Sequence, residues 1–391
     1  MSFDKNTIKT YAADSAYLFT NIFPLALSMA VCSGIGAAGG IIAAAIACLL
    51  VAYRKTKLIM PVYASYLIAA FTYSEYGLST LSASIALSGA AMIALAFLGF
   101  DFKRIVFKPV VVAIMLATAI SVTVIETNNY FGIGVSGNMV NTLLHAYRSF
   151  GFHPNWHGIL YGTIVLVIMI TYPRKFKKTD KIIRAPFVAL ALTLILNLIL
   201  NPADMISPIE EIGEYSRSIK PMLLPLFKGG VDLGGVLTSG LSFFIMTAYS
   251  VSEFNGSNLD YASTGAANCF CSGIAGAFMP VTTHNYKRKS LAGIPAAILC
   301  ILIFVFSSKY IARIPVASCA VVLIVGTWQS VKWSEIKRAF IDVPSLGSFI
   351  AVIFFMLLFG AVKGVLFGGL CSFICSLVAN NQHQEQPNQN I

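Results

Sequence analysis

The chain has 391 residues, of which 57% are hydrophobic and 11% charged, and its mean hydropathy is +0.78. A soluble domain carries about 25% charged residues, so this composition excludes a soluble globular protein of this size. The net charge of +11 does not indicate nucleic-acid binding, because the cations flank apolar runs, where membrane topology explains them. We therefore expect a polytopic membrane protein that contacts lipid and no nucleic acid.

The N-terminal residues 1–15 lack the short apolar core and the small-residue cleavage site of a secretory signal, so the first apolar segment should stay in the protein. No residue from Ser15 to Tyr53 is charged, a run about twice as long as the ~20 residues that cross a bilayer. Pro24 and the small-residue stretch 33–40 interrupt this run. The sequence therefore predicts two helices here rather than one.

Fourteen apolar segments follow one another along the chain. They cover 16–33, 37–53, 59–72, 79–98, 107–126, 157–172, 183–200, 231–251, 261–278, 281–289, 291–307, 315–328, 345–361 and 364–379. This pattern predicts an all-α polytopic membrane protein with about 14 transmembrane segments. Two segments, which open with Met60-Pro61 and Met279-Pro280, are short for a full crossing.

The loop charges fix the orientation that we expect. With a cytoplasmic N-terminus and alternating loops, 20 of the 27 cations fall inside, six of them in the dense loop 173–184. The positive-inside rule favours this arrangement. We therefore expect a multi-pass protein of the bacterial inner membrane, with both termini in the cytoplasm.

The segments group into two halves. We expect a cytoplasmic N-terminus over 1–15, a first seven-segment repeat over 16–200, an extracytoplasmic connection over 201–230, a second seven-segment repeat over 231–379 and a polar disordered tail over 380–391. Each half places a short segment that begins with proline third. Corresponding interrupted segments point to a transporter with inverted repeats and a site near the bilayer midplane. The outside loops 127–156 and 201–230 are expected to hold short interfacial helices.

The stretch 279-MPVTTHNYKRKS-290 carries the candidate site. A helix over 282–289 would be about 12 Å long, close to half of a ~30 Å hydrocarbon core. With the cations of 287–289 at the cytoplasmic surface, its N-terminus would lie near the midplane, where free N–H groups and the helix dipole favour an anion. A facing half-helix would begin at Pro61. The candidate substrate-binding residues are Pro61, Val62, Tyr63, Ser65, Thr282, Thr283, His284 and Lys287. A proline-kinked helix followed by an ordinary cationic loop stays open as the simpler alternative.

Other kinds of site have no support in the sequence. The eight cysteines lie at positions 32, 48, 269, 271, 300, 319, 371 and 375, nearly all inside apolar stretches. Their spacing matches neither a metal site nor a redox pair. We interpret them as packing residues, and we expect no metal site, no cofactor and no catalytic residues.

Five stretches in order carry recognisable motifs. They are 23-FPLALSMAVCSG-34, Met60-Pro61, 99-GFDFKRIVFKPVVVAI-114, 265-GAANCFCSGIAGAFMPVTT-283 and 314-IPVASCAVVLIVGTWQSVKWSEIKRAF-340. Together they resemble the sulfate permease (SulP) family of anion transporters over roughly residues 20–380. The resemblance implies two inverted seven-segment repeats that form core and gate domains, an elevator-like movement and a homodimer. It also implies substrate contacts from Phe23 and Ser28 of the first helix.

The sequence departs from the family pattern at several points. Leu25 replaces a glutamine, Met60-Pro61 replaces Gly-Pro, and Lys287 stands where a longer family stretch carries an arginine. The eighth segment has acidic residues only at its ends, Asp232 and Glu253, so sodium coupling is not expected. Only about a dozen polar residues follow the last segment, where the family usually has a STAS domain.

The expected function is secondary active transport or exchange of a small inorganic or carboxylate anion, of the sulfate, bicarbonate, chloride or dicarboxylate class. A nucleobase permease of the same fold is the alternative, although its usual glutamates in the eighth and tenth segments are missing. A glycan polymerase or ligase is a third interpretation, since polar residues gather in the outside loops. They are Arg148, His153, His157, Glu210, Glu211 and Arg217.

Overall fold

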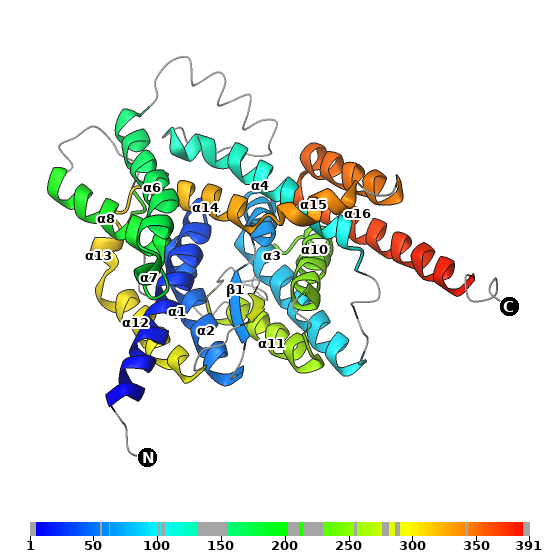
Figure 1. Cartoon of the computed structure of the whole chain (residues 1–391), viewed down its shortest axis with the longest axis horizontal. Helices are drawn as coiled ribbons and strands as arrows, with labels where there is room; N and C mark the ends of the chain where they lie inside the picture. The colour runs from blue at the N-terminus through cyan, green and yellow to red at the C-terminus, as the bar shows by residue number, and fades with distance from the viewer. Residues whose placement is uncertain are drawn as a thin grey trace.

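The computed structural model describes most of the chain. The described residues are 5–54, 57–61, 63–99, 102, 106–131, 155–201, 211–213, 230–253, 256–275, 281–285, 290–340 and 343–385. Within them the chain is helical apart from short turns and one two-stranded sheet (Figure 1). This confirms the predicted all-α class, with the strand pair as an addition that the sequence did not predict.

The two halves of the chain repeat one order of elements. The first contains α1 (Lys5–Cys32), α2 (Ala37–Arg54), β1 (Lys57–Pro61), α3 (Tyr63–Phe97), α4 (Lys108–Tyr130), α6 (Trp156–Lys175), α7 (Lys177–Asp180) and α8 (Ala185–Leu200). The second contains α10 (Leu233–Glu253), α11 (Asn258–Ala275), β2 (Val281–Asn285), the 3-10 turn η2 (Ser290–Ala292), α12 (Gly293–Phe306), α13 (Ser308–Ile311), α14 (Val316–Ser330), α15 (Trp333–Ala339) and α16 (Val343–Glu385). Each half thus opens with two helices and a strand. Because β1 and β2 pair antiparallel, the halves meet in opposite directions, as inverted repeats do.

Six helices of the described chain are long and apolar enough to cross a membrane. Four shorter apolar helices accompany them, at Ala37–Ala52, Ala185–Leu200, Gly293–Phe306 and Val316–Ser330. Large apolar side chains face outward on these elements, for example Ile199 on α8, Ile301 on α12 and Phe354 on α16. Such a surface is stable against lipid and not against water, so the chain is a multi-pass membrane protein.

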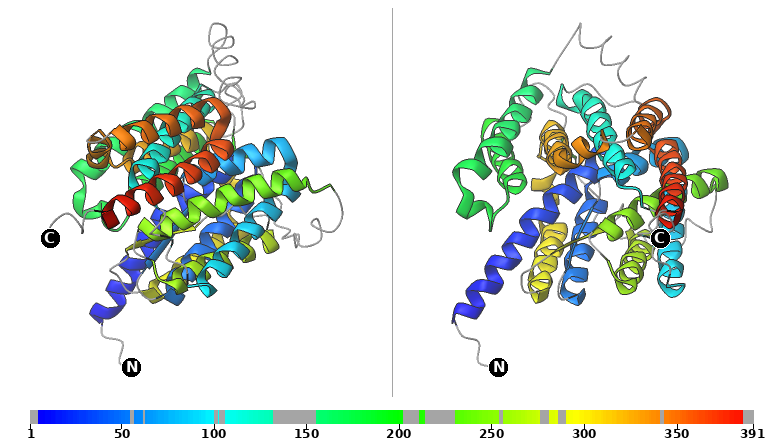
Figure 2. Two further views of the ribbon diagram at one scale, coloured as in Figure 1. Left: turned by 90° about the vertical axis from the view of Figure 1, so that its right-hand side faces the viewer. Right: turned by 45° about the vertical axis from the view of Figure 1, so that its right-hand side comes forward.

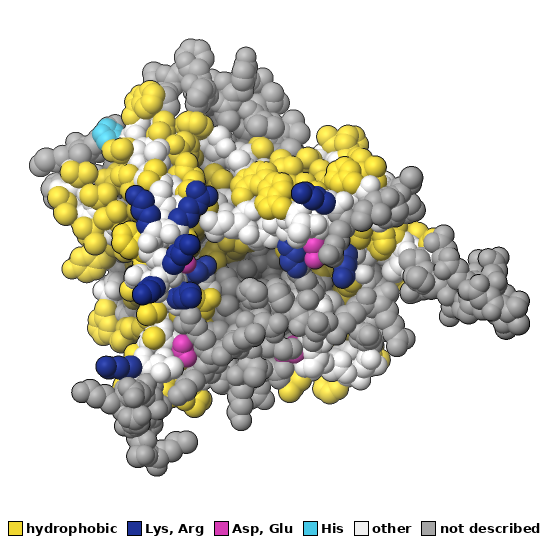
Figure 3. Space-filling view, viewed as in Figure 1, with side chains coloured by type: hydrophobic (Ala, Val, Ile, Leu, Met, Phe, Trp, Pro, Cys, Tyr) yellow, Lys and Arg dark blue, Asp and Glu magenta, His cyan; other side chains and the backbone are white. Residues whose placement is uncertain are grey.

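Lysine and arginine side chains gather on one part of the surface. Around α7, Arg174, Lys175, Lys177 and Lys178 are exposed, and Figure 3 shows a cluster of cations on this part of the molecule beside wide hydrophobic areas. This is the dense cationic loop of the sequence. The cations of this loop therefore lie together on the surface, as those of a membrane-flanking loop do.

Two of the longest helices are in fact pairs of helices joined at a glycine. Gly77 in α3 has φ 79° and ψ 179°, and Gly360 in α16 has φ 84° and ψ 171°. Residues with a side chain rarely adopt this backbone conformation, so glycine is required at both kinks. The kink at Gly77 lies between the predicted segments 59–72 and 79–98, and the kink at Gly360 lies one residue before the predicted end of 345–361. The division of each helix into two segments is confirmed, and the second kink comes slightly earlier than the predicted boundary.

The prediction of a tenth helical segment is wrong. Residues 281–285 form strand β2, which pairs with β1 in the register Pro61 to Val281 and Lys57 to Asn285. A helix over 282–289 is therefore excluded at its first four positions, and 286–289 lie outside the described residues. The β-branched run of Val281, Thr282 and Thr283 favours an extended backbone. The facing half-helix also starts later than predicted, at Tyr63 rather than at Pro61, which ends β1.

Other boundaries differ by shorter lengths. The helix α1 begins at Lys5, so most of the expected N-terminal extension 1–15 is helical, and α16 continues to Glu385, past the expected start of the tail at 380. The helix α4 reaches Tyr130. Most of the two outside loops, for which we predicted interfacial helices, lies outside the described residues.

The helices form two groups. In the core group, α3 packs against α10 and α11, and α2 packs against α1 and α12; in the gate group, α4 packs against α14 and α16, and α6 packs against α8 and α14. Figure 2 shows α12 beside α2 and α16 beside α10 from two directions. Small residues allow the closest crossings, as at Gly89 of α3 against Gly265 of α11. The strand pair lies near the centre of the molecule (Figure 1).

Candidate functional site

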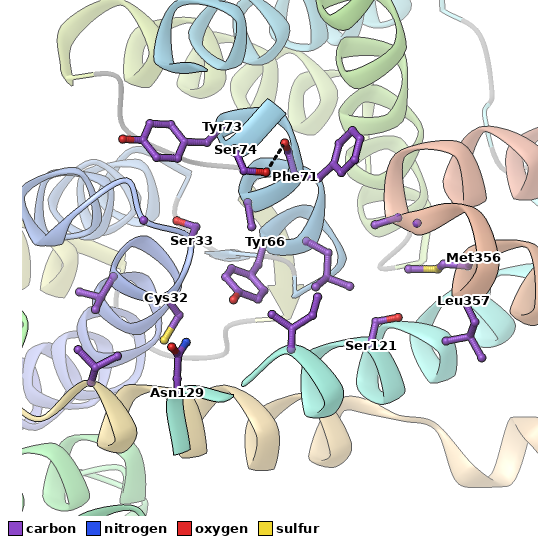
Figure 4. Close-up of a pocket in the computed structure, with 18 of the residues that line it drawn as sticks. Cys32, Ser33, Tyr66, Phe71, Tyr73, Ser74, Ser121, Asn129, Met356 and Leu357 are labelled. Atoms are coloured by element: carbon purple, nitrogen blue, oxygen red, sulfur yellow. Dashed lines mark hydrogen bonds between the residues drawn. The ribbon is translucent and has the colours of Figure 1, made fainter. Parts of the chain in front are cut away.

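A cavity of about 700 Å³ lies between the two helix groups. The core group contributes Cys32 and Ser33 from the end of α1 and Tyr66 from α3. The gate group contributes Ser121 and Asn129 from α4, together with residues around the kink of α16. Figure 4 shows Tyr66 extending from α3 toward the side on which Cys32 and Asn129 lie. The volume suits a small hydrated solute, and both groups supply polar side chains to it.

Part of the cavity lining comes from residues near the start of α3. Tyr66 lines the cavity and lies three residues after Tyr63, which is less than one helical turn, or about 4.5 Å along the axis. The first turn of a helix has free N–H groups and the positive end of the helix dipole, and both favour an anion. A second feature of this turn is Ser65, which is fully buried and whose hydroxyl has no hydrogen-bond partner. A buried hydroxyl without a partner is costly, so a ligand that bonds to it would be stabilised.

The strand pair places the two predicted half-sites side by side. Thr282 pairs with Met60, Thr283 with Ile59 and His284 with Leu58. Pro61, which has no N–H to donate, ends β1 opposite Val281 and leads directly to α3. The backbone thus brings the predicted stretches around 61 and 282 together, although only one of them continues as a helix.

The remaining predicted residues are spread more widely. The ring of Tyr63 packs against Gly326 of α14, so this side chain reaches the gate group rather than the strand pair. Phe23 is buried and stacks on Phe19, with 5.1 Å between ring centroids, and Ser28 is fully buried in α1. Val62 and Lys287 lie outside the described residues.

Glu126 of α4 is a polar residue that the sequence analysis missed. It is fully buried, and its carboxylate accepts hydrogen bonds from the Tyr66 hydroxyl and from Asn129 Nδ2, the latter at 2.7 Å. An acidic residue at the end of the apolar segment 107–126 was the signal that could have revealed it, because carboxylates in membrane segments are costly and mark functional sites.

A second polar network lies within the gate group. Asn197 of α8 accepts a hydrogen bond from the Tyr161 hydroxyl at 3.3 Å and donates to Glu211 Oε1 at 2.6 Å and to the carbonyl of Arg313 at 2.7 Å. Arg313 and Glu211 also form an ion pair at 3.4 Å. Glu211 is one of the polar residues of the outside loops on which the polymerase interpretation rests. In the structure Glu211 contacts Asn197 and Arg313. The network joins α6, α8 and the segment before α14.

Two curated proteins are similar to the chain in sequence. The bicarbonate transporter BicA of Picosynechococcus is 25% identical in an alignment of 355 positions that covers 81% of this chain and 60% of BicA. The putative sulfate transporter YvdB of Bacillus subtilis is 23% identical in an alignment of 378 positions that covers 90% of this chain and 70% of YvdB. The chain is thus similar in sequence to two transporters, as its motifs predicted. No family model matches it, and it spans only part of the length of either relative.

Solved structures agree with the fold of this chain. The transmembrane domain of a cyanobacterial BicA superposes with a TM-score of 0.72 at 18% identity and covers 93% of this chain and 98% of that one. SLC26A9 superposes with a TM-score of 0.76 at 13% identity and covers 96% of this chain and 66% of that one. Murine Slc26a9, an anion transporter in the inward-facing state, gives 0.75 at 12% identity. The core and gate groups thus follow a fold seen in other membrane proteins.

Proposed function

We propose that this chain is a secondary active transporter or exchanger of a small anion, with sulfate and bicarbonate as the first candidates. The observation that carries the proposal is the cavity between the core and gate groups, which is lined by Tyr66, the residue that follows the buried Ser65 in the first turn of α3. The names of the two relatives, one a bicarbonate and one a putative sulfate transporter, support the same substrate class. Relative movement of the two groups, in the manner of an elevator, would expose the site to each side in turn.

In this proposal the anion lies at the start of α3, next to the paired strands. The N–H groups of the first helical turn and the Ser65 hydroxyl replace part of its hydration shell, and Thr282, Thr283 and His284 lie on the strand beside them. A site of dipoles and hydroxyls binds an anion and still releases it, because no fixed counter-charge holds it. Lys287 adds positive potential from further away. Pro61, Val62, Tyr63, Phe23 and Ser28 shape the surroundings.

The same proposal covers orientation and assembly. Both termini lie in the cytoplasm of a bacterial inner membrane, with the cationic loop around α7 on that side. The repeats span 16–200 and 231–379. The protein works as a homodimer within lipid. The experiment that tests the function is uptake of radiolabelled sulfate and of radiolabelled bicarbonate into liposomes that contain the purified protein; absence of uptake and of exchange for both anions, and for chloride and dicarboxylates, would exclude it.

Ser65→Ala is expected to weaken anion binding about fivefold, since it removes one donor worth roughly 1 kcal/mol. Binding of the best-transported anion to purified protein would be measured by calorimetry. Ser84→Ala is the matched control, because Ser84 is also fully buried in α3 and its hydroxyl already donates to the carbonyl of Thr80 at 2.7 Å. Equal affinity of both variants and the parent would place the anion elsewhere.

Transport is expected not to depend on sodium. The helix α10 runs from Leu233 to Glu253, and between its ends it carries no carboxylate that would hold a sodium ion. Replacing external sodium by potassium at matched membrane potential should leave the initial rate of uptake unchanged. A loss of uptake in potassium would contradict this prediction and would mean that the protein binds sodium at a site outside α10.

A further inference from the structure

Glu126 is a buried carboxylate that is not part of the proposed anion site. It lies four residues before the end of α4, and its side chain is fully buried. The Tyr66 hydroxyl donates to Oε1, Asn129 Nδ2 donates to Oε2 at 2.7 Å, and the Cys32 thiol also contacts the carboxylate. Cys319 of α14 is the other titratable group that faces it. Among the described residues no lysine or arginine contacts Glu126.

The hydrogen bonds fit the ionised form of Glu126. A carboxylate only accepts hydrogen bonds, whereas a protonated carboxyl must donate one. Here both oxygens receive donors, so the negative charge is held by hydrogen bonds rather than by a counter-ion. A buried charge held in this way is costly once a donor is removed, and the usual response is uptake of a proton.

The donors belong to different helix groups. Asn129 lies on α4 itself, in the gate group, and stays with Glu126 however the groups move. Tyr66 lies on α3 and Cys32 on α1, both in the core group. Any displacement of α3 past α4 therefore separates the Tyr66 hydroxyl from Oε1 and leaves the charge with fewer donors.

The cavity supplies a route for the proton. Three residues that contact Glu126, namely Cys32, Tyr66 and Asn129, line the cavity, and Figure 4 shows them around it. Other charged groups at the cavity are Glu211, which is paired with Arg313, and the exposed Lys363 of α16. Water that fills the cavity thus reaches the carboxylate as soon as Tyr66 moves aside.

We propose that Glu126 is the binding site for a coupling proton. It is ionised while Tyr66 donates to it, and it takes up a proton when α3 moves away from α4. A hydronium ion in the cavity gives the proton: one of its O–H bonds breaks and leaves water, and an O–H bond forms at Oε1. When Tyr66 returns, this O–H bond breaks and a water molecule takes the proton as hydronium. The role of this proton in transport rests on the proposed function, whereas the protonation itself does not.

The position of Tyr66 also connects the two sites. Tyr66 contacts Glu126 and lies within one turn of the start of α3, where the anion is proposed to bind. Two negative charges on the order of 10 Å apart repel enough to change an equilibrium roughly tenfold at an effective dielectric constant of about 20. An anion at α3 therefore favours the protonated form of Glu126, so that anion and proton would move together.

The first experiment needs no substrate. Infrared spectra of the purified protein are recorded over a pH series, and the carboxyl band of protonated carboxylic acids is followed. The band that titrates is expected to disappear in Glu126→Gln and to persist in Glu75→Gln, a matched change at an exposed residue of α3. In Tyr66→Phe the ratio of protonated to ionised Glu126 at a given pH should rise about tenfold, since a donor to the charged form is lost. A band that persists in Glu126→Gln, or a Tyr66→Phe variant that titrates like the parent, would overturn the proton site.

The second experiment tests coupling. Uptake of radiolabelled sulfate, which stays a dianion near neutral pH, is measured in liposomes with and without an inward proton gradient. The gradient should accelerate uptake severalfold in the parent and in Glu75→Gln, and should have no effect in Glu126→Gln, which should still exchange sulfate for sulfate. Equal acceleration in Glu126→Gln would overturn the coupling. If the parent transports no anion, the proposed function fails, and the infrared titration still decides whether Glu126 binds the proton.

Discussion

Replacing Gly265 by leucine should prevent most of the protein from reaching its folded state. A Cβ atom at Gly265 would lie 2.5 Å from the carbonyl oxygen of Gly89, and a Cβ at Gly89 would lie 2.6 Å from that of Gly265. These are backbone atoms of α11 and α3, so no side-chain rotation relieves the overlap and the two helices must separate. Overpacking of this kind costs about 3 kcal/mol or more, a large part of the stability of a protein.

The measurement is the fraction of purified protein that elutes as a single species in detergent, together with its apparent unfolding temperature. Gly347→Leu in α16 is the matched control, because a Cβ at Gly347 meets nothing within 4 Å and that position is exposed. The control should behave like the parent. If Gly265→Leu also behaved like the parent, the close crossing of α3 and α11 would be wrong.

Asn197→Leu is expected to lower the apparent unfolding temperature by about 5 °C, which corresponds to roughly 2 kcal/mol. Leucine has nearly the shape of asparagine and makes none of its hydrogen bonds. The Tyr161 hydroxyl, Glu211 Oε1 and the carbonyl of Arg313 would each lose a partner, and buried polar groups without partners are costly. The loss of stability should arise in the gate group, where these residues contact one another.

Thr193→Val provides the comparison on the same helix. Thr193 is also fully buried in α8, but its hydroxyl donates only to the carbonyls of Ala189 and Leu190 within that helix. Its replacement should change the unfolding temperature by less than half as much. Similar values for both variants would mean that the network around Asn197 contributes no more than an ordinary helix contact.

The helices could be predicted from the sequence because the bilayer imposes a simple rule. A crossing helix must be apolar over about 20 residues, and the apolar runs of this chain show where that condition is met. Apart from 281–289 and the first residues of 59–72, each predicted segment falls largely within a helix. Even the divisions within α3 and α16 were visible, since Gly77 lies between two apolar runs and Gly360 lies at the end of one.

The strand pair could not be predicted in the same way. The sequence around Thr282 and Thr283 fits a short helix after a proline as well as a strand, and the choice depends on whether another extended segment is available. That segment, β1, lies far away in the sequence. No local pattern contains this information, because it is the fold that brings β1 to β2.

The predicted site residues stay a prediction. Tyr66, the residue after Ser65, lines the cavity, whereas the predicted second helix N-terminus is a strand. Glu126 was missed because its main partner, Tyr66, lies 60 positions earlier and on another helix. A single acidic residue at the end of an apolar segment resembles the beginning of a loop until its contacts are known.

The strand pair also limits the order in which the chain can be completed in the cell. Pro61 pairs with Val281, 220 positions further along the chain, so β1 has no partner until most of the second half has been synthesised. At roughly 10 residues per second this delay is about 20 s. An extended strand cannot remain unpaired in hydrocarbon, since its N–H and C=O groups would be unsatisfied there. The newly made first half therefore needs a temporary partner for β1, either water or the insertion machinery, and final assembly has to wait for the ribosome to deliver β2.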